Sequence, residues 1–206
     1  MAAPRMVPDC PDAAIADWIE IRLRDALNRT DGPIAITVPG GSTPFPILRD
    51  LAGRDLAWRR IAIWPGDDRL VPEDHPASNV GRIRALMAPA GAHIVPLEPN
   101  VAPPRFALAW LGMGSDGHIA SLFPNTDPRP DDPVPLRRIT PDPLPPEAPF
   151  DRLTLTIPAL LCSDEIVFVI RGADKRALFE EAAAGRNDLP VARLLCAATQ
   201  PVTCFT

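Results

Sequence analysis

A short apolar run from Phe106 to Leu111 ends abruptly in a glycine-rich turn, and this junction constrains the fold more than any other stretch of the chain. The turn contains three glycines, one acid and one histidine: Gly112, Gly114, Gly117, Asp116 and His118. Glycine lets the backbone turn sharply or approach a ligand closely, because it has no Cβ. In open α/β sheets, ligands bind at the carboxyl ends of buried strands. The junction therefore predicts a strand of such a sheet with a functional site at its end.

Short apolar runs alternate with helical patterns along the chain, which predicts an α/β fold. Strands are expected at 34–38, 60–64, 93–97, 106–111, 152–156, 165–170 and 202–205, and helices at 11–29, 44–51, 78–86, 172–182 and 189–197. This order favours one domain over residues 1–206, with a doubly wound, mainly parallel, Rossmann-like sheet and helices on both faces. Two proline-containing segments, 98–105 and 124–149, are expected to lack helices, and the longer one is predicted to be a functional or adaptable loop.

Composition excludes several classes of protein. No run of about 18 apolar residues is present, so no membrane span is expected, and residues 1–11 lack the apolar core of a signal peptide. The four cysteines form no C-x-x-C pair, which argues against zinc and redox motifs and favours reduced thiols in the cytoplasm. A net charge of -5 without a basic stripe disfavours nucleic acid as a partner.

The glycines of the junction match the pattern G-x-G-x-x-G, which raises the possibility of a dinucleotide site. Such a site needs a helix and a second strand after the glycines, with an acid about 20 residues on. Prolines instead crowd residues 124–135. We therefore expect neither a nicotinamide nor a flavin, and no other cofactor or metal is predicted.

Three more predicted strands end in polar residues that suit an anionic ligand. Gly40-Gly41-Ser42-Thr43 precedes Pro44 at a predicted helix start, where backbone amides attract phosphate. Asp67-Asp68-Arg69 follows the strand at 60–64. Lys175, at the start of another helix, is the only lysine among 21 basic residues, which indicates a position that requires a compact ammonium group.

The stretch from Leu111 to Pro124, LGMGSDGHIASLFP, resembles the signature of the 6-phosphogluconolactonases, in the superfamily that also contains the glucosamine-6-phosphate deaminases. The segments Gly40–Thr43 and Gly172–Lys175 also resemble that family, and the resemblance covers nearly the whole chain. Two features of this chain depart from the usual sequence pattern of the family. Asp68 stands where the family usually has Glu, and segment 98–105 lacks the helix usually found there.

The resemblance implies hydrolysis of 6-phospho-D-glucono-1,5-lactone to 6-phosphogluconate in the pentose phosphate pathway. His118 would be the general base that activates water, Asp116 would orient His118 or the sugar hydroxyls, and Arg69 would hold the phosphate or stabilise developing charge. The predicted substrate-binding residues are Gly40, Gly41, Ser42, Thr43, Asp67, Asp68, Gly114 and Lys175. The partner is a small sugar-phosphate lactone, and protein partners are left open.

Two alternatives belong to other functional classes. A sugar-phosphate deaminase-isomerase would be expected to carry an acid five residues after the histidine, and Phe123 occupies that position. A non-catalytic sugar-phosphate sensor would normally carry a helix-turn-helix for DNA binding. The sequence begins directly with the predicted domain, so no such element is expected.

Overall fold

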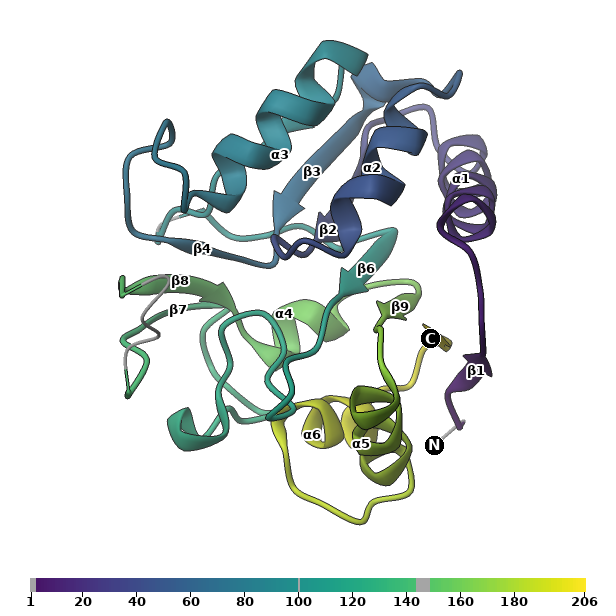
Figure 1. Cartoon of the computed structure of the whole chain (residues 1–206). Helices are drawn as coiled ribbons and strands as arrows, with labels where there is room; N and C mark the ends of the chain where they lie inside the picture. The colour runs from purple at the N-terminus through teal and green to yellow at the C-terminus, as the bar shows by residue number, and fades with distance from the viewer. Residues whose placement is uncertain (1–2, 100, 144–148) are drawn as a thin grey trace.

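The centre of the molecule is a parallel sheet, seen in a computed structural model that describes residues 3–99, 101–143 and 149–206. Within these residues its seven strands follow the order β1-β10-β9-β6-β2-β3-β5, and every neighbouring pair is parallel. Figure 1 labels β1, β9, β6, β2 and β3 of this sheet. The strands are β1 (Arg5–Val7), β2 (Ile34–Val38), β3 (Ile61–Pro65), β5 (His93–Ile94), β6 (Leu108–Leu111), β9 (Ile166–Val169) and β10 (Val202–Phe205). The predicted mainly parallel α/β sheet is confirmed.

Helices cover both faces of this sheet, as expected for buried parallel strands. One face packs against α1 (Asp12–Asn28), α2 (Pro44–Ala52) and α3 (Asn79–Met87), and the other against α4 (Ile157–Leu161), α5 (Ala173–Ala183) and α6 (Pro190–Ala197). Short 3-10 turns cover Trp58–Arg60, Ala88–Ala90 and Pro124–Thr126. No helix in the described part of the chain is long and apolar enough to cross a membrane.

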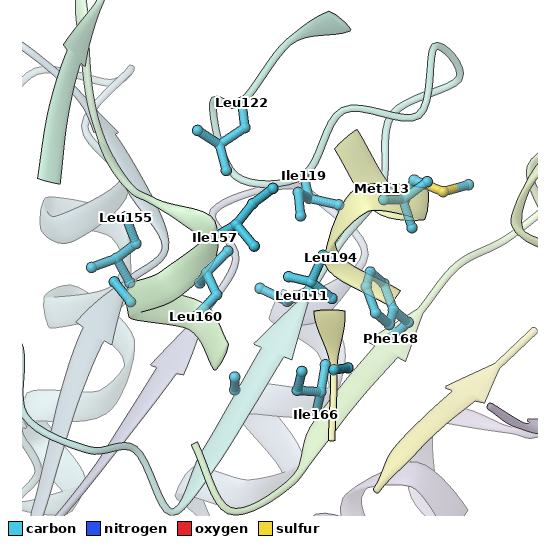
Figure 2. Packing of buried hydrophobic residues seen from close by; sticks show 14 of the residues in the cluster. Leu111, Met113, Ile119, Leu122, Leu155, Ile157, Leu160, Ile166, Phe168 and Leu194 are labelled. Atoms are coloured by element: carbon cyan, nitrogen blue, oxygen red, sulfur yellow. The ribbon is translucent and has the colours of Figure 1, made fainter. Parts of the chain in front are cut away.

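The strands contribute alternate residues to two hydrophobic clusters, one on each face. In β6, Leu108 and Trp110 join the cluster beneath α1, α2 and α3, whereas Ala109 and Leu111 join the cluster on the opposite face. Figure 2 shows Leu111 in that second cluster, near Leu194 of α6. Because successive side chains of a strand point to opposite faces, the central strands link the two clusters.

The order of the strands reverses between β2 and β6. From β2 the chain proceeds outward through β3 to β5, then returns to β6 on the other side of β2 and continues through β9 to β10. The crevice at such a switch point, beyond the carboxyl ends of the strands, is the usual place for a ligand in this class of fold.

A second sheet, antiparallel and three-stranded among the described residues, was not predicted. It has the order β4-β8-β7, formed by β4 (Asp67–Arg69), β8 (Arg152–Leu155) and β7 (Leu136–Ile139). The expected strand at 152–156 exists, but as part of this sheet. The prediction that 124–149 is a loop is wrong for β7, and residues 144–148 lie outside the described part. β4 has no apolar residue, and β7 has two exposed arginines between its two buried apolar residues, so neither shows the alternation of a strand.

Three smaller expectations also fail. The edge strand β1 was missed, and β5 is shorter than the predicted strand at 93–97. Helix α4 was missed because Pro158 suggested the end of an element; here the proline occupies the first turn of α4, where its lack of an N–H costs nothing. Segment 98–105 contains no helix in its described residues, as predicted.

Candidate active site

A cavity of about 300 Å³ lies at the switch point, beyond the carboxyl ends of β2 and β6. Nine of the predicted site residues line it: Gly40, Gly41, Ser42, Thr43, Asp67, Arg69, Gly114, His118 and Lys175. The four polar strand ends therefore meet, as the fold class predicts. Two predicted residues, Asp68 and Asp116, do not line this cavity, and each contacts a neighbour that does.

Asp116 lies behind His118 and holds its ring. The Asp116 Oδ1 atom is 2.6 Å from His118 Nδ1, and it also accepts a hydrogen bond from the His118 backbone N–H at 3.2 Å. A carboxylate at this distance favours the tautomer with the proton on Nδ1. The Nε2 atom is then an acceptor and can take a proton from a bound water. Of the two roles considered for Asp116, the geometry fits orientation of His118.

The charge of this pair depends on the balance between burial and hydrogen bonding. Burial alone would raise the pKa of Asp116, but the charge of His118 and hydrogen bonds from His118 outweigh it and hold that pKa below its ordinary value. Asp116 is therefore ionised at neutral pH and stabilises a positive charge on the imidazole.

Glycines allow the polar residues to approach the backbone closely. A Cβ on Gly114 would lie 2.2 Å from His118 Nδ1 and 2.6 Å from Asp116 Oδ1, so only glycine leaves room for the pair. A Cβ on Gly40 would lie 2.0 Å from the side chain of Asn79. Both positions need the absence of a side chain, which explains why these strands end in glycine.

Asn79, the first residue of α3, fixes the guanidinium of Arg69. The Oδ1 atom of Asn79 accepts a hydrogen bond from Arg69 Nη1 at 2.6 Å, and its Nδ2 atom donates to the backbone oxygen of Asp67 at 2.8 Å. The same Nη1 atom of Arg69 donates to the carbonyl of Ala77 at 3.2 Å. Arg69 therefore has a fixed position at the cavity wall.

Asp68 faces the start of α3 rather than the cavity. Its carboxylate accepts hydrogen bonds from three backbone amides, those of Asn79 at 2.6 Å, Arg69 at 2.8 Å and Val80 at 3.1 Å. Burial raises the pKa of Asp68, and these amides oppose that rise. The geometry fits a helix cap better than the predicted contact with substrate, and the short side chain of Asp suits it.

Ser121 joins the loop that carries His118 to the second sheet. Its hydroxyl donates to the Asp67 carboxylate, and its backbone N–H donates to Thr154 Oγ1 at 3.1 Å. Both partners are buried residues on neighbouring strands, β4 and β8. The unpredicted sheet therefore sets the position of the candidate base.

Lys175 approaches the cavity from the side opposite Arg69. It belongs to the first turn of α5, after β9, and its Nζ donates to the carbonyl of Met113 at 2.8 Å. The loop Gly40–Thr43 lies between these two cations in strand order, at the end of β2. Thr43 occupies the N-cap position of α2, but its side chain makes no capping hydrogen bond.

Among the lining residues that were not predicted as site residues, three have amide or guanidinium side chains that suit an anionic ligand: Asn79, Arg152 and Arg171. Arg152 begins the alternating stretch Arg-Leu-Thr-Leu-Thr, and a charged residue at the start of a buried strand was the available signal. It is 5% exposed. Arg171 is ion-paired with Asp12 at 2.7 Å, a contact between distant parts of the sequence that no local pattern indicates.

The residues around His118 bear on three other kinds of site: a deaminase site, a dinucleotide site and a metal site. The ring of Phe123 lies beside the imidazole, with 4.8 Å between ring centroids, where a deaminase-type sequence would carry an acid. The residues after Gly117 form turns rather than a helix, so the G-x-G-x-x-G pattern lacks its dinucleotide-binding context. No group of three or more His, Cys, Asp or Glu side chains in the described ranges is arranged to hold a metal ion.

Comparisons with known proteins bear on the family and the fold. The family model of glucosamine-6-phosphate isomerases/6-phosphogluconolactonase matches residues 11–103 and 88–203. A 6-phosphogluconolactonase of Mesorhizobium japonicum is 34% identical, over 96% of this chain and 92% of that protein. One from Pseudomonas aeruginosa is also 34% identical, over 84% of this chain and 82% of that protein. The crystal structure of the Thermotoga maritima 6-phosphogluconolactonase superimposes with a TM-score of 0.82, at 24% identity, over 98% of each chain.

Proposed function

The chain belongs to the family of glucosamine-6-phosphate isomerases and 6-phosphogluconolactonases, and we propose that it is a 6-phosphogluconolactonase. Its substrate would be 6-phospho-D-glucono-1,5-lactone and its product 6-phosphogluconate. The pentose phosphate pathway and a cytoplasmic location are the setting that this activity implies, and they are part of the proposal.

The single observation that carries the proposal is the Asp116–His118 pair at the wall of a cationic cavity. Nδ1 of His118 is engaged by Asp116 at 2.6 Å, while the ring itself lines the cavity. Four positively charged side chains line the same cavity in the described part of the chain, Arg69, Arg152, Arg171 and Lys175. A base and an anion-binding surface in one cavity are what hydrolysis of a phosphorylated lactone requires.

The phosphate would bind between the loop Gly40–Thr43 and Lys175. The amides at the start of α2 carry the positive end of the helix dipole, and the ammonium of Lys175 supplies a compact charge. The hydroxyls of Ser42 and Thr43 line the same part of the cavity. With the phosphate bound there, the lactone ring would extend toward His118.

Hydrolysis then needs one water and one base. Nε2 of His118 removes a proton as the water oxygen bonds to C1, and the carbonyl oxygen becomes an oxyanion. The C1–O5 bond breaks, and O5 takes the proton back from Nε2 to become a hydroxyl. The new carboxylic acid loses its proton to solvent. Asp116 stabilises the imidazolium in between.

The test is turnover of freshly prepared lactone, with spontaneous opening subtracted. His118→Asn should lower kcat by about 10²–10⁴-fold, the usual contribution of a general base, while the Kd for 6-phosphogluconate stays close to that of the wild type. His75→Asn, at a histidine outside the cavity lining, is the control and should keep full activity. Turnover near the wild-type rate in His118→Asn would assign the base to another group.

The deaminase alternative has a direct test with the same preparation. Glucosamine 6-phosphate should release no ammonia, because Phe123 occupies the position of the acid that ring opening would use. Ammonia release that depends on His118, without lactone hydrolysis above background, would replace the proposal. Tight sugar-phosphate binding without either reaction would favour the non-catalytic sensor.

A further inference from the structure

Arg152 and Arg69 lie directly opposite each other on two antiparallel strands, β8 and β4. Residues paired in this way point to the same face of the sheet, and like charges in that arrangement are destabilising. Both side chains line the cavity. Burial lowers the pKa of Arg152, and the charge of Arg69 lowers it further. The fold therefore brings a second guanidinium to the site at a cost in stability.

Phe123 links Arg152 to the candidate base. The Cζ atom of Arg152 is 6.0 Å from the centroid of the Phe123 ring, and the same ring is 4.8 Å from the imidazole of His118. Asp67 also connects Arg152 to the loop that carries His118. The Oδ2 atom of Asp67 is 4.0 Å from Arg152 Nη1 and accepts a hydrogen bond from the hydroxyl of Ser121 in that loop. Arg152 thus belongs to the His118 end of the cavity.

The end of the cavity proposed to bind the phosphate lies apart from the arginine pair. Lys175 follows β9, whereas Arg69 follows β3, and β6 and β2 lie between them. Three strand spacings of roughly 4.8 Å each give about 14 Å between β9 and β3. A ligand held by its phosphate near Lys175 would reach toward the arginine pair with its other end.

We infer that Arg152, together with Arg69, forms the site for the C1 oxygens: the oxyanion during hydrolysis and the carboxylate of the product. This inference rests on the proposed lactonase function. The carbonyl oxygen of the lactone is neutral when the substrate binds, becomes negative as water adds to C1, and remains as one of the two carboxylate oxygens. One pair of guanidiniums can therefore serve both species, because each has its negative charge at the same atom.

Product binding tests the assignment without turnover. Two probes differ only at C1: 6-phosphogluconate carries a carboxylate, and glucitol 6-phosphate carries a hydroxymethyl group. The wild type should bind 6-phosphogluconate about ten times more tightly or better, as expected for charge-assisted hydrogen bonds. Arg152→Met should reduce this preference about tenfold and change the Kd of glucitol 6-phosphate less than about twofold. An unchanged preference, or equal weakening of both probes, would overturn the assignment.

Kinetics give a second readout that a structural role would not produce. In Arg152→Met, kcat should fall by about 10²–10³-fold, as when an oxyanion donor is removed, with little change in KM because the bound lactone is uncharged at C1. A rise in KM at constant kcat would instead assign Arg152 to ground-state binding and overturn the inference.

Three variants keep the test interpretable. Arg138→Met removes an exposed arginine from the neighbouring strand β7 and should leave the probe preference unchanged. Arg152→Lys keeps the charge but loses the planar fork, so its preference for 6-phosphogluconate should fall less than that of Arg152→Met. If Arg152→Met does not fold, Arg152→Lys takes its place in the test. An unchanged preference in Arg152→Lys would then overturn the inference. Lys175→Ala should weaken both probes equally. A wild type without lactonase turnover but with an Arg152-dependent preference would reject the proposed function and keep the C1 site.

Discussion

The chemistry of the site depends on one contact, the 2.6 Å approach of Asp116 to His118. Both residues pack over Gly114, where a Cβ would overlap them. The contact therefore requires a specific residue at three of the five positions from 114 to 118: Gly114, Asp116 and His118. This local constraint explains why the stretch Gly114–His118 is the most informative part of the sequence for function.

Replacing Asp116 by Asn should slow turnover. Because the pKa of Asp116 lies below its ordinary value, the carboxylate is ionised at neutral pH and stabilises the imidazolium that forms when His118 takes a proton from water. Asn has a similar shape but carries no charge, and a hydrogen bond to a charged group contributes about 1.5–3 kcal/mol. The kcat of Asp116→Asn should therefore fall by about 10–100-fold, and the loss should persist throughout the neutral range, where the wild-type carboxylate stays ionised.

Initial rates at neutral pH measure this loss once spontaneous opening is subtracted. Asp127→Asn is a suitable control, since this exposed carboxylate pairs with Arg193, away from the cavity. A kcat at the wild-type value in Asp116→Asn would show that the carboxylate does not support the base.

At the scale of elements, the second sheet and the start of α3 hold the site together. β4 contributes Asp67, which accepts a hydrogen bond from the Ser121 hydroxyl. It also contributes Asp68, which accepts hydrogen bonds from backbone amides at the start of α3. Asn79 at the start of α3 in turn fixes Arg69. The cap and the site thus share one helix terminus.

Asp68→Ala should destabilise the protein by about 2 kcal/mol, since it removes a helix cap and leaves buried amides without an acceptor. Thermal and urea unfolding measure the loss, and Asp74→Ala, at an exposed acid of the loop before α3, should change stability little. The folded fraction should keep a measurable affinity for 6-phosphogluconate, because Asp68 does not line the cavity. Loss of affinity with unchanged stability would restore the original prediction that Asp68 contacts substrate.

The sequence predicted the parallel sheet because each central strand is buried on both faces and reads as an apolar run that ends in polar or glycine-rich residues. It did not predict β4, β7 or the pairing of Arg69 with Arg152. β4 (Asp67–Arg69) has no apolar residue and pairs with β8 across more than 80 positions of sequence. β7 (Leu136–Ile139) is close to β8 in sequence, but two arginines lie between its two apolar residues, so it shows no alternating pattern. The orientation of Asp68 was missed for a related reason, because spacing cannot tell a cap from a ligand contact.

At the scale of the whole molecule, the two hydrophobic clusters share the strands that separate them. Val167 and Val169 of β9 belong to one cluster, whereas Ile166 and Phe168 belong to the other. Loss of packing on one face would therefore expose the strands that support the other face. Strong mutual dependence of this kind favours cooperative unfolding.

We accordingly predict that residues 1–206 unfold as one domain, in a single transition. Leu160→Ala truncates a fully buried side chain in the cluster that contains α4, and Leu48→Ala truncates one in the cluster that contains α2. Each should lower the free energy of unfolding by about 2–5 kcal/mol, the usual effect of such a cavity. Tryptophan fluorescence reports on both clusters, because Trp64 lies in one and Trp110 in the other. If the chain unfolds as one unit, fluorescence and circular dichroism should give the same midpoint in each variant. Separate midpoints in Leu160→Ala, with the helical signal of the α1–α3 face retained, would instead divide the chain into two folding units.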